Sequence, residues 1–250
     1  MNGGFGMTSI IEKYLPNVAN LGWTGDSGWW TSIIQTLYMT LWPAIFGGIL
    51  GLIFGIILVV TKPKGILENK LWFSICDKLV SLFRAVPFII LLAVIAPVTK
   101  LIVGTQIGTT AAIVPLSLGV FPFYARQVQV ALESVNNGKV EAAQALGATN
   151  TDIILDVYLR EARSELVRIS TVTLISLVGL TAMAGAIGAG GLGNTAISYG
   201  YNRFNNDITI VATLLVLLIV IVIQLVGDFL ANILNPVSYT HLRAHETLAN

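Results

Sequence analysis

Three glycines are spaced like the phosphate-binding glycines of a dinucleotide loop. Gly188, Gly190 and Gly193 fit the pattern G-x-G-x-x-G, in which the backbone approaches a pyrophosphate closely. That chemistry needs a strand before the loop and an acidic residue about 20 residues after it. Here an apolar stretch precedes the loop and Asp207 comes too early. The glycines instead predict the end of a helix, either as a simple stop or as part of a gate.

Other catalytic and metal-binding patterns are missing. Cys76 is the only cysteine, which excludes a disulfide within the chain and a cysteine-rich metal site. His241 and His245 lie in a tail that follows Pro236, and we assign no metal site to them. No Gly-x-x-x-x-Gly-Lys-[Ser/Thr] phosphate loop occurs. We therefore predict a non-catalytic chain without a metal or cofactor.

The composition is that of a membrane protein. Of 250 residues, 55% are hydrophobic and 11% are charged, with a mean hydropathy of +0.80, whereas soluble domains carry about 25% charged residues. The net charge of +1 provides no basic surface for nucleic acid. Lys13 stands alone near the N-terminus, so a cleaved signal peptide is not expected.

Five apolar segments are long enough to cross a bilayer, which takes about 20 residues. They must be helical, because a single span has to satisfy its backbone hydrogen bonds internally. The predicted spans are residues 33–60, 79–98, 107–130, 166–186 and 208–230.

The basic residues predict the orientation of these spans, since they concentrate on the cytosolic side of a membrane. Only Lys13, Lys100 and Arg203 fall on the side of the N-terminus. The opposite side holds Lys62, Lys64, Lys70, Lys78, Arg84, Arg126, Lys139, Arg160, Arg163, Arg168 and Arg243. We expect the N-terminus outside and the loop between the third and fourth spans in the cytosol, with Trp23, Trp29 and Trp30 in an outer aromatic belt.

That loop contains a short helix, a turn and a second helix. Asn137-Gly138 is expected to break the third span, and residues 140–146 to form a short helix that ends at Gly147 in a left-handed conformation. Thr149 and Asp152 then predict a capping box for the next helix. The alanines of this segment leave a flat surface that suits docking into a groove.

The loop resembles the coupling loop of bacterial ABC importer permeases, which has the form Glu-Ala-Ala, three residues, Gly, nine residues, an aliphatic residue, any residue, Leu, Pro. Its counterparts here are Glu141, Ala142, Ala143, Gly147, Val157 and Leu159. Arg160 replaces the final proline.

Four further stretches resemble the methionine-uptake permeases in particular: FRAVPFIILL (83–92), IVGT (102–105), AAIVPL (111–116) and GAIGAGGLG (185–193). The resemblance extends from about Thr31 to Asp228. It implies an all-α permease of the type I ABC importer fold in a bacterial inner membrane, with five transmembrane helices. It also implies pairing with a second copy, two copies of an ATP-binding cassette ATPase and a substrate-binding lipoprotein.

The resemblance and the hydropathy pattern together divide the chain into three parts. We expect an extracytoplasmic extension at residues 1–30 and a transmembrane domain at residues 31–235. Residues 236–250 lose the hydrophobic pattern and look like translated linker sequence that is foreign to the fold.

Residues within the spans are candidates for the translocation path. Arg84 is an intramembrane charge and thus a functional candidate, but at the predicted inner end of its span it can snorkel, which we favour. Pro87 is expected to kink the helix beside a path. Gly188 and Gly190 belong either to a helix stop or to an outer gate.

Two sets of residues are predicted to mediate helix packing. Gly47, Gly51 and Gly55 predict close helix packing, within the subunit rather than between subunits. Gln224 and Asp228 are expected to form hydrogen bonds between helices.

We weigh three alternatives to a methionine permease. A permease for another small solute fits the same motifs. An ion-coupled secondary transporter predicts an intramembrane acid or matching broken helices, which the sequence does not show. A membrane-embedded enzyme needs polar catalytic groups at membrane depth, and none converge.

Overall fold

The computed structural model describes residues 15–25 and 27–234. The predicted foreign tail at residues 236–250, both histidines and Lys13 lie outside these residues, as does half of the predicted outer extension.

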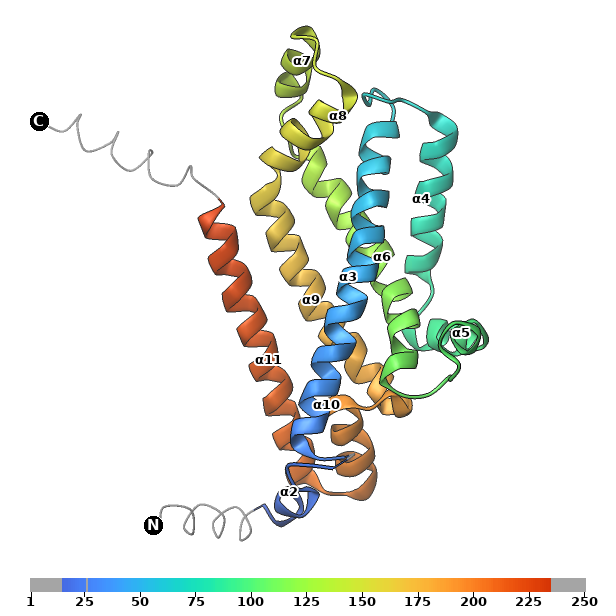
Figure 1. Cartoon of the computed structure of the whole chain (residues 1–250), viewed down its shortest axis with the longest axis vertical. Coiled ribbons are helices and arrows are strands. Elements are labelled where there is room, and N and C mark those ends of the chain that lie inside the picture. Colours follow the sequence, from blue (N-terminus) through green and yellow to red (C-terminus); the bar gives the residue numbers. More distant parts are fainter. Residues whose placement is uncertain (1–14, 26, 235–250) are drawn as a thin grey trace, which may run out of the picture.

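The described chain is helical throughout and contains no strand (Figure 1). The helices that make up the bundle are α3 (Trp29–Thr61), α4 (Lys70–Ala85), α5 (Phe88–Val103), α6 (Thr109–Glu133), α9 (Arg163–Ala184) and α11 (Asn206–Ile233). Shorter elements join them: α2 (Pro16–Leu21), α7 (Asn137–Ala145), α8 (Asn150–Asp152), the π-helical turns η1 (Ile153–Leu159), η2 (Gly185–Ala189) and η3 (Thr195–Gly200), α10 (Gly191–Asn194) and the 3-10 turn η4 (Tyr201–Arg203).

Four of the five predicted spans are confirmed as single long apolar helices. They are α3, α6, α9 together with η2, and α11. The predicted second span is wrong as one helix, because residues 79–98 belong to two helices, α4 and α5, that meet at 108°. The bend lies at Pro87, as the sequence predicts. Val86 is extended there (φ −81°, ψ 120°), which is the conformation that a following proline imposes.

The core of the bundle is the close contact of α3 with α6. A Cβ atom added at Gly47, Gly51 or Gly55 would come within 2.7–2.9 Å of a backbone oxygen of α6. Only glycine at these three positions lets the two backbones approach so closely. The prediction of packing within the subunit is confirmed.

The loop elements lie at the two ends of the bundle. In Figure 1, α7 and α8 occupy one end, and α2 and α10 the other. α11 packs mainly on α9 and leaves most of its apolar side chains exposed in the single chain. Gln224 donates to Asp228 at 2.8 Å within α11, so the predicted bond between helices is replaced by one within a helix.

Candidate docking loop and translocation path

The first candidate site is the loop from α7 to η1. Its short helix begins earlier than predicted, at Asn137, because the Asn136 side chain caps it by accepting from the Gly138 N–H at 2.8 Å. The break after the third span therefore lies before Asn137-Gly138, around residues 134–136. Val140 points inward and is buried, which anchors α7 on the bundle.

The predicted elbow after α7 is confirmed. Gly147 has φ +81°, and its N–H donates to the Gln144 oxygen at 3.0 Å. The capping box also forms: Thr149 N–H donates to Asp152 Oδ2 at 2.9 Å, and Asp152 N–H donates to Thr149 Oγ1 at 3.3 Å. Hydrogen bonds from the Thr149 side chain and backbone lower the pKa of Asp152 below its ordinary value of 3.8.

The motif residues separate into an exposed and an internal group. Glu141 and Ala142 are exposed, and Ala143 is half-buried. Val157 and Leu159 pack against a buried cluster that includes Val59, Val128, Leu132 and Ile153. The first group can therefore meet a partner, whereas the second holds the elbow on the bundle.

Sequence reasoning missed the most exposed apolar side chain of this loop. Leu146 is 89% exposed and directly precedes the elbow glycine. An exposed leucine in a polar loop does not contribute to a hydrophobic core. The signal in the sequence that could have identified Leu146 as a contact residue is its position between the Glu-Ala-Ala motif and Gly147. We define the docking face as Glu141, Ala142 and Leu146.

Ion pairs at the same end of the bundle fix the neighbouring helices. Arg126 on α6 donates to Asp77 on α4 at 2.7 Å and to Gln129 at 2.7 Å. Lys139 on α7 pairs with Glu161. The Lys139 pair is largely exposed and adds little stability by itself, but it links α7 to the segment that leads into α9.

The second candidate site surrounds Arg84. The sequence predicts this residue near the start of the second span, whereas the structure has it at the break between α4 and α5. α4 begins at Lys70, nine residues before the predicted start, and Arg84 occupies its last turn. At 1.5 Å per residue, Arg84 lies about 21 Å along the helix from Lys70. Figure 1 shows that α4 ends near mid-height of the bundle, where α5 turns aside.

A cavity of about 320 Å³ opens beside Arg84. Its other walls come from the helix break after α4 and from the middle of α6 and α9. The lining residues are Phe83, Arg84, Val86, Phe88, Leu91, Gly119, Val120, Phe123, Ser176 and Leu180. Pro87 sits between two of them, so the predicted kink does border the cavity.

The glycines after α9 lie at the other end of the bundle. Gly188 and Gly190 have φ +96° and +93°, and the helical path is interrupted at Ile187 and Gly188. The helix therefore ends at these glycines, which fits both a helix stop and an outer gate. The following turn is held on α3, where the Gly191 N–H donates to Gln35 Oε1 at 2.7 Å and the Leu192 N–H to Thr36 Oγ1 at 2.8 Å.

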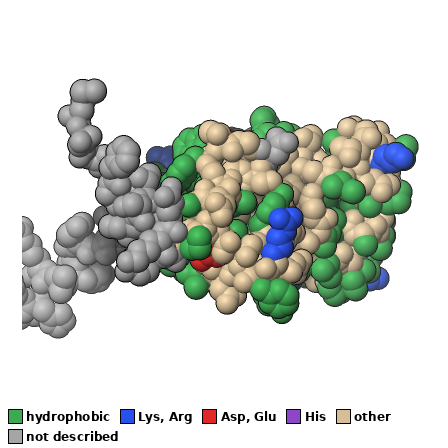
Figure 2. Space-filling view, turned by 90° about the horizontal axis from the view of Figure 1, so that it is seen from below, with side chains coloured by type: hydrophobic (Ala, Val, Ile, Leu, Met, Phe, Trp, Pro, Cys, Tyr) green, Lys and Arg blue, Asp and Glu red, His purple; other side chains and the backbone are tan. Residues whose placement is uncertain are grey.

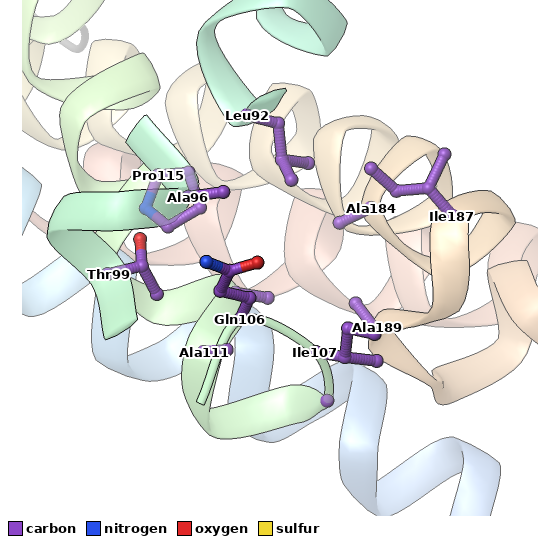
Figure 3. A pocket seen from close by; sticks show the side chains of 12 residues that line it. Leu92, Ala96, Thr99, Gln106, Ile107, Ala111, Pro115, Ala184, Ile187 and Ala189 are labelled. Carbon is purple, nitrogen blue, oxygen red and sulfur yellow. The ribbon is translucent and has the colours of Figure 1, made fainter. Parts of the chain in front are cut away.

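A small cavity of about 20 Å³ lies beside these glycines (Figure 3). Side chains from α5, the α5–α6 loop, α6, the end of α9 and η2 surround it, among them Thr99, Gln106, Ala184 and Ile187. The buried Thr99 hydroxyl has no hydrogen-bond partner among the described residues. This cavity is much smaller than the one beside Arg84.

Comparison with known proteins places this architecture in a family. Residues 47–237 match the family described as the inner membrane component of binding-protein-dependent transport systems. The chain belongs to this family of multi-pass bacterial membrane proteins.

Curated relatives cover most of the chain. A probable D-methionine transport system permease protein, MetI, of Vibrio cholerae is 50% identical over 80% of this chain and 89% of its own length. The methionine import system permease protein MetP of Bacillus subtilis is 42% identical over 90% of this chain and 99% of its own.

Solved structures share the fold. A chain of the MetNI methionine ABC transporter in an inward-facing conformation has a TM-score of 0.80 and 43% identity, covering 82% of this chain and 94% of that one. An amino acid ABC transporter crystallised with histidines has a TM-score of 0.67 at 18% identity, which shows the fold alone. The all-α type I importer permease fold is therefore confirmed.

Proposed function

We propose that this chain is the membrane-spanning permease subunit of an ATP-driven methionine importer. The observation that carries the proposal is the docking face of Glu141, Ala142 and Leu146. It directly precedes the Gly147 elbow in a chain that has the fold of this family. The substrate follows from the relatives, whose names specify methionine at 42–50% identity over most of this chain. A permease for another small solute is the alternative.

The working assembly in this proposal contains two copies of the chain, two copies of an ATP-binding cassette ATPase and an outside substrate-binding lipoprotein. The docking loop enters a groove of the ATPase, and the apolar faces that α11 leaves exposed lie in the bilayer. The subunit performs no bond chemistry, since ATP is bound and hydrolysed by its partner.

The proposed orientation places the docking loop in the cytosol and α2 and α10 outside. Basic residues support it, because Lys62, Arg126 and Lys139 all lie toward the α7 end. Figure 2 views the opposite end, where the surface is mostly uncharged with isolated basic side chains. Trp23, Tyr201 and Phe204 are strongly exposed at that end and suit an interfacial aromatic belt.

Transport then follows from rigid-body motion. Closure of the ATPase dimer moves the Glu141–Leu159 elbow, which is packed through Val157 and Leu159 on the core. The spans rock from inward-open to outward-open as the elbow moves. Arg84 and Pro87 border the path at mid-height, and Gly188 and Gly190 form its outer gate.

The domain limits proposed from the sequence remain 1–30 for the outer extension and 31–235 for the transmembrane domain. α2 fits an outer position in that extension, since Asn17 donates to both carboxylate oxygens of Asp207 at 3.0 Å. Residues 236–250 are proposed to be dispensable.

Co-purification tests this function. The tagged chain, extracted from native membranes in mild detergent, should retain an ATPase that contains a nucleotide-binding loop. Leu146→Asp should abolish that association, because it places a charge at the centre of the docking face. Phe204→Ser, at an equally exposed position on the opposite end, should leave it intact. Absence of any ATPase from the unmodified chain would refute the proposal.

A further inference from the structure

Arg84 is a cation on the wall of the cavity at the α4–α5 break, and its side chain is exposed in the single chain. Arg84 forms no ion pair with any described residue, and no acidic side chain lines the cavity beside it. An unpaired charge in a membrane-spanning bundle is costly unless it faces water, so we expect the exposed Arg84 side chain to face a hydrated part of the cavity. A fixed positive charge at this place is therefore available to an anionic group that enters the cavity.

The cavity has the size and lining of a small-molecule site. Its volume of about 320 Å³ falls in the range of ligand pockets. Phe88, Leu91, Phe123 and Leu180 make most of the wall apolar, and Arg84 and Ser176 are its polar side chains. Gly119 opens room for the Phe88 ring, which would come within 2.9 Å of an added Cβ.

The polar groups match the two charges of an amino acid. A guanidinium binds a carboxylate through two parallel hydrogen bonds. Ser176 Oγ donates to the Val172 oxygen at 2.9 Å, which leaves its lone pairs free to accept from an ammonium group. The carbonyl end of α4 lies at the same break and carries partial negative charge.

We propose that Arg84 binds the carboxylate of the transported amino acid at this helix break, while the aromatic and aliphatic wall receives an apolar side chain. This makes the cavity a substrate site of the permease itself, separate from any binding protein. The inference rests on the proposed transport function and specifies its substrate class: α-amino carboxylates with an apolar side chain.

Cysteine protection provides a direct test. Cys76 is the only cysteine and is buried, so Cys76→Ala gives a background for Ser176→Cys as a reporter inside the cavity. The purified permease–ATPase complex is alkylated with a maleimide at increasing methionine concentrations. Methionine should slow the reaction, whereas 3-(methylthio)propylamine, which lacks the carboxylate, should not. Equal protection by the amine would overturn the proposal, and this comparison requires no substitution of Arg84.

Variants of Arg84 give the second measurement. Arg84→Gln should raise the methionine concentration needed for protection about tenfold or more, the factor expected for losing a charge-assisted hydrogen bond. Arg84→Lys should have a smaller effect, since lysine keeps the positive charge but cannot form the two parallel hydrogen bonds of a guanidinium. Lys78→Gln, on an exposed face of the same helix, should change nothing.

The outcomes separate this inference from the proposed function. Unchanged protection in Arg84→Gln would overturn the site while the ATPase still co-purifies. If Arg84→Gln does not fold, the proposal is tested by comparing protection by methionine with protection by the amine in the chain that keeps Arg84. Loss of ATPase association from the unmodified chain would instead defeat the transport proposal.

Discussion

At the scale of single residues, the elbow depends on the conformation of Gly147. Its φ of +81° costs an L-residue about 1–2 kcal/mol, and more when the side chain is β-branched. We predict that Gly147→Val reduces ATP-driven uptake by at least about tenfold, by reorienting the docking face. Uptake into proteoliposomes, normalised to inserted protein, measures the effect.

Gly104 offers a matched control for that variant. It also has a positive φ, +86°, and an added Cβ would meet nothing within 4 Å. Gly104→Val therefore introduces similar backbone strain at the end of α5, far from the docking face. It should lower thermal stability to a similar degree while uptake persists. Equal loss of uptake in both variants would show that strain alone, and not docking, explains the result.

At the scale of elements, the helix that follows the elbow owes its start to Thr149 and Asp152. The hydrogen bonds lower the pKa of Asp152 in the folded chain, so their stabilisation is fully present above the unfolded value of about 3.8. It is lost as pH falls through the lower folded value. We predict that protection of the residue 150–159 amides from hydrogen exchange declines on acidification in that range.

Asp152→Asn should reduce that protection already at pH 7, because the amide removes the charge from the capping box. Asp156→Asn, at an exposed acid outside the box, should not. If the two variants exchanged alike at pH 7, the cap would have no part in ordering the segment.

The α3–α6 contact gives a second prediction at this scale. An alanine Cβ at Gly51 would lie 2.8 Å from the Phe121 oxygen, whereas one at Gly48 meets nothing within 4 Å. We expect Gly51→Ala to destabilise the chain by about 1–3 kcal/mol through overpacking. Gly48→Ala should be neutral or stabilising by about 0.5–1 kcal/mol, because glycine weakens helix interiors. Thermal unfolding of the two variants in detergent compares them, and a loss at Gly48 equal to that at Gly51 would contradict the packing argument.

These elements show where sequence reasoning succeeds. Gly147, the Thr149–Asp152 cap and the glycines of α3 obey rules that act within a few residues, and the structure bears them out. Four spans were predictable because their apolar runs are uninterrupted. The family resemblance then defined the fold that these spans build.

The same reasoning failed at the second span for a physical reason. The charged residues Lys70, Asp77 and Lys78 lower the local hydropathy, so the apolar run that predicts the span begins only at Leu79. In the fold, Asp77 pairs with Arg126 on α6, a contact between distant residues that hydropathy cannot detect. The early start places Arg84 in the last turn of α4, at the break before α5, and not near the start of a span.

At the scale of the whole molecule, the proposed mechanism requires the docking loop and η4 to lie on opposite sides of the membrane. Leu146 and Phe204 are suited to report this, being 89% and 90% exposed at opposite ends of the bundle. In the Cys76→Ala background, Leu146→Cys and Phe204→Cys each provide a single reactive thiol. A membrane-impermeant maleimide added to spheroplasts should label position 204 at once and position 146 only after permeabilisation. Labelling of position 146 in sealed spheroplasts would place the elbow outside, where no ATP-hydrolysing partner could drive it, because the force for transport must enter from the side that holds ATP.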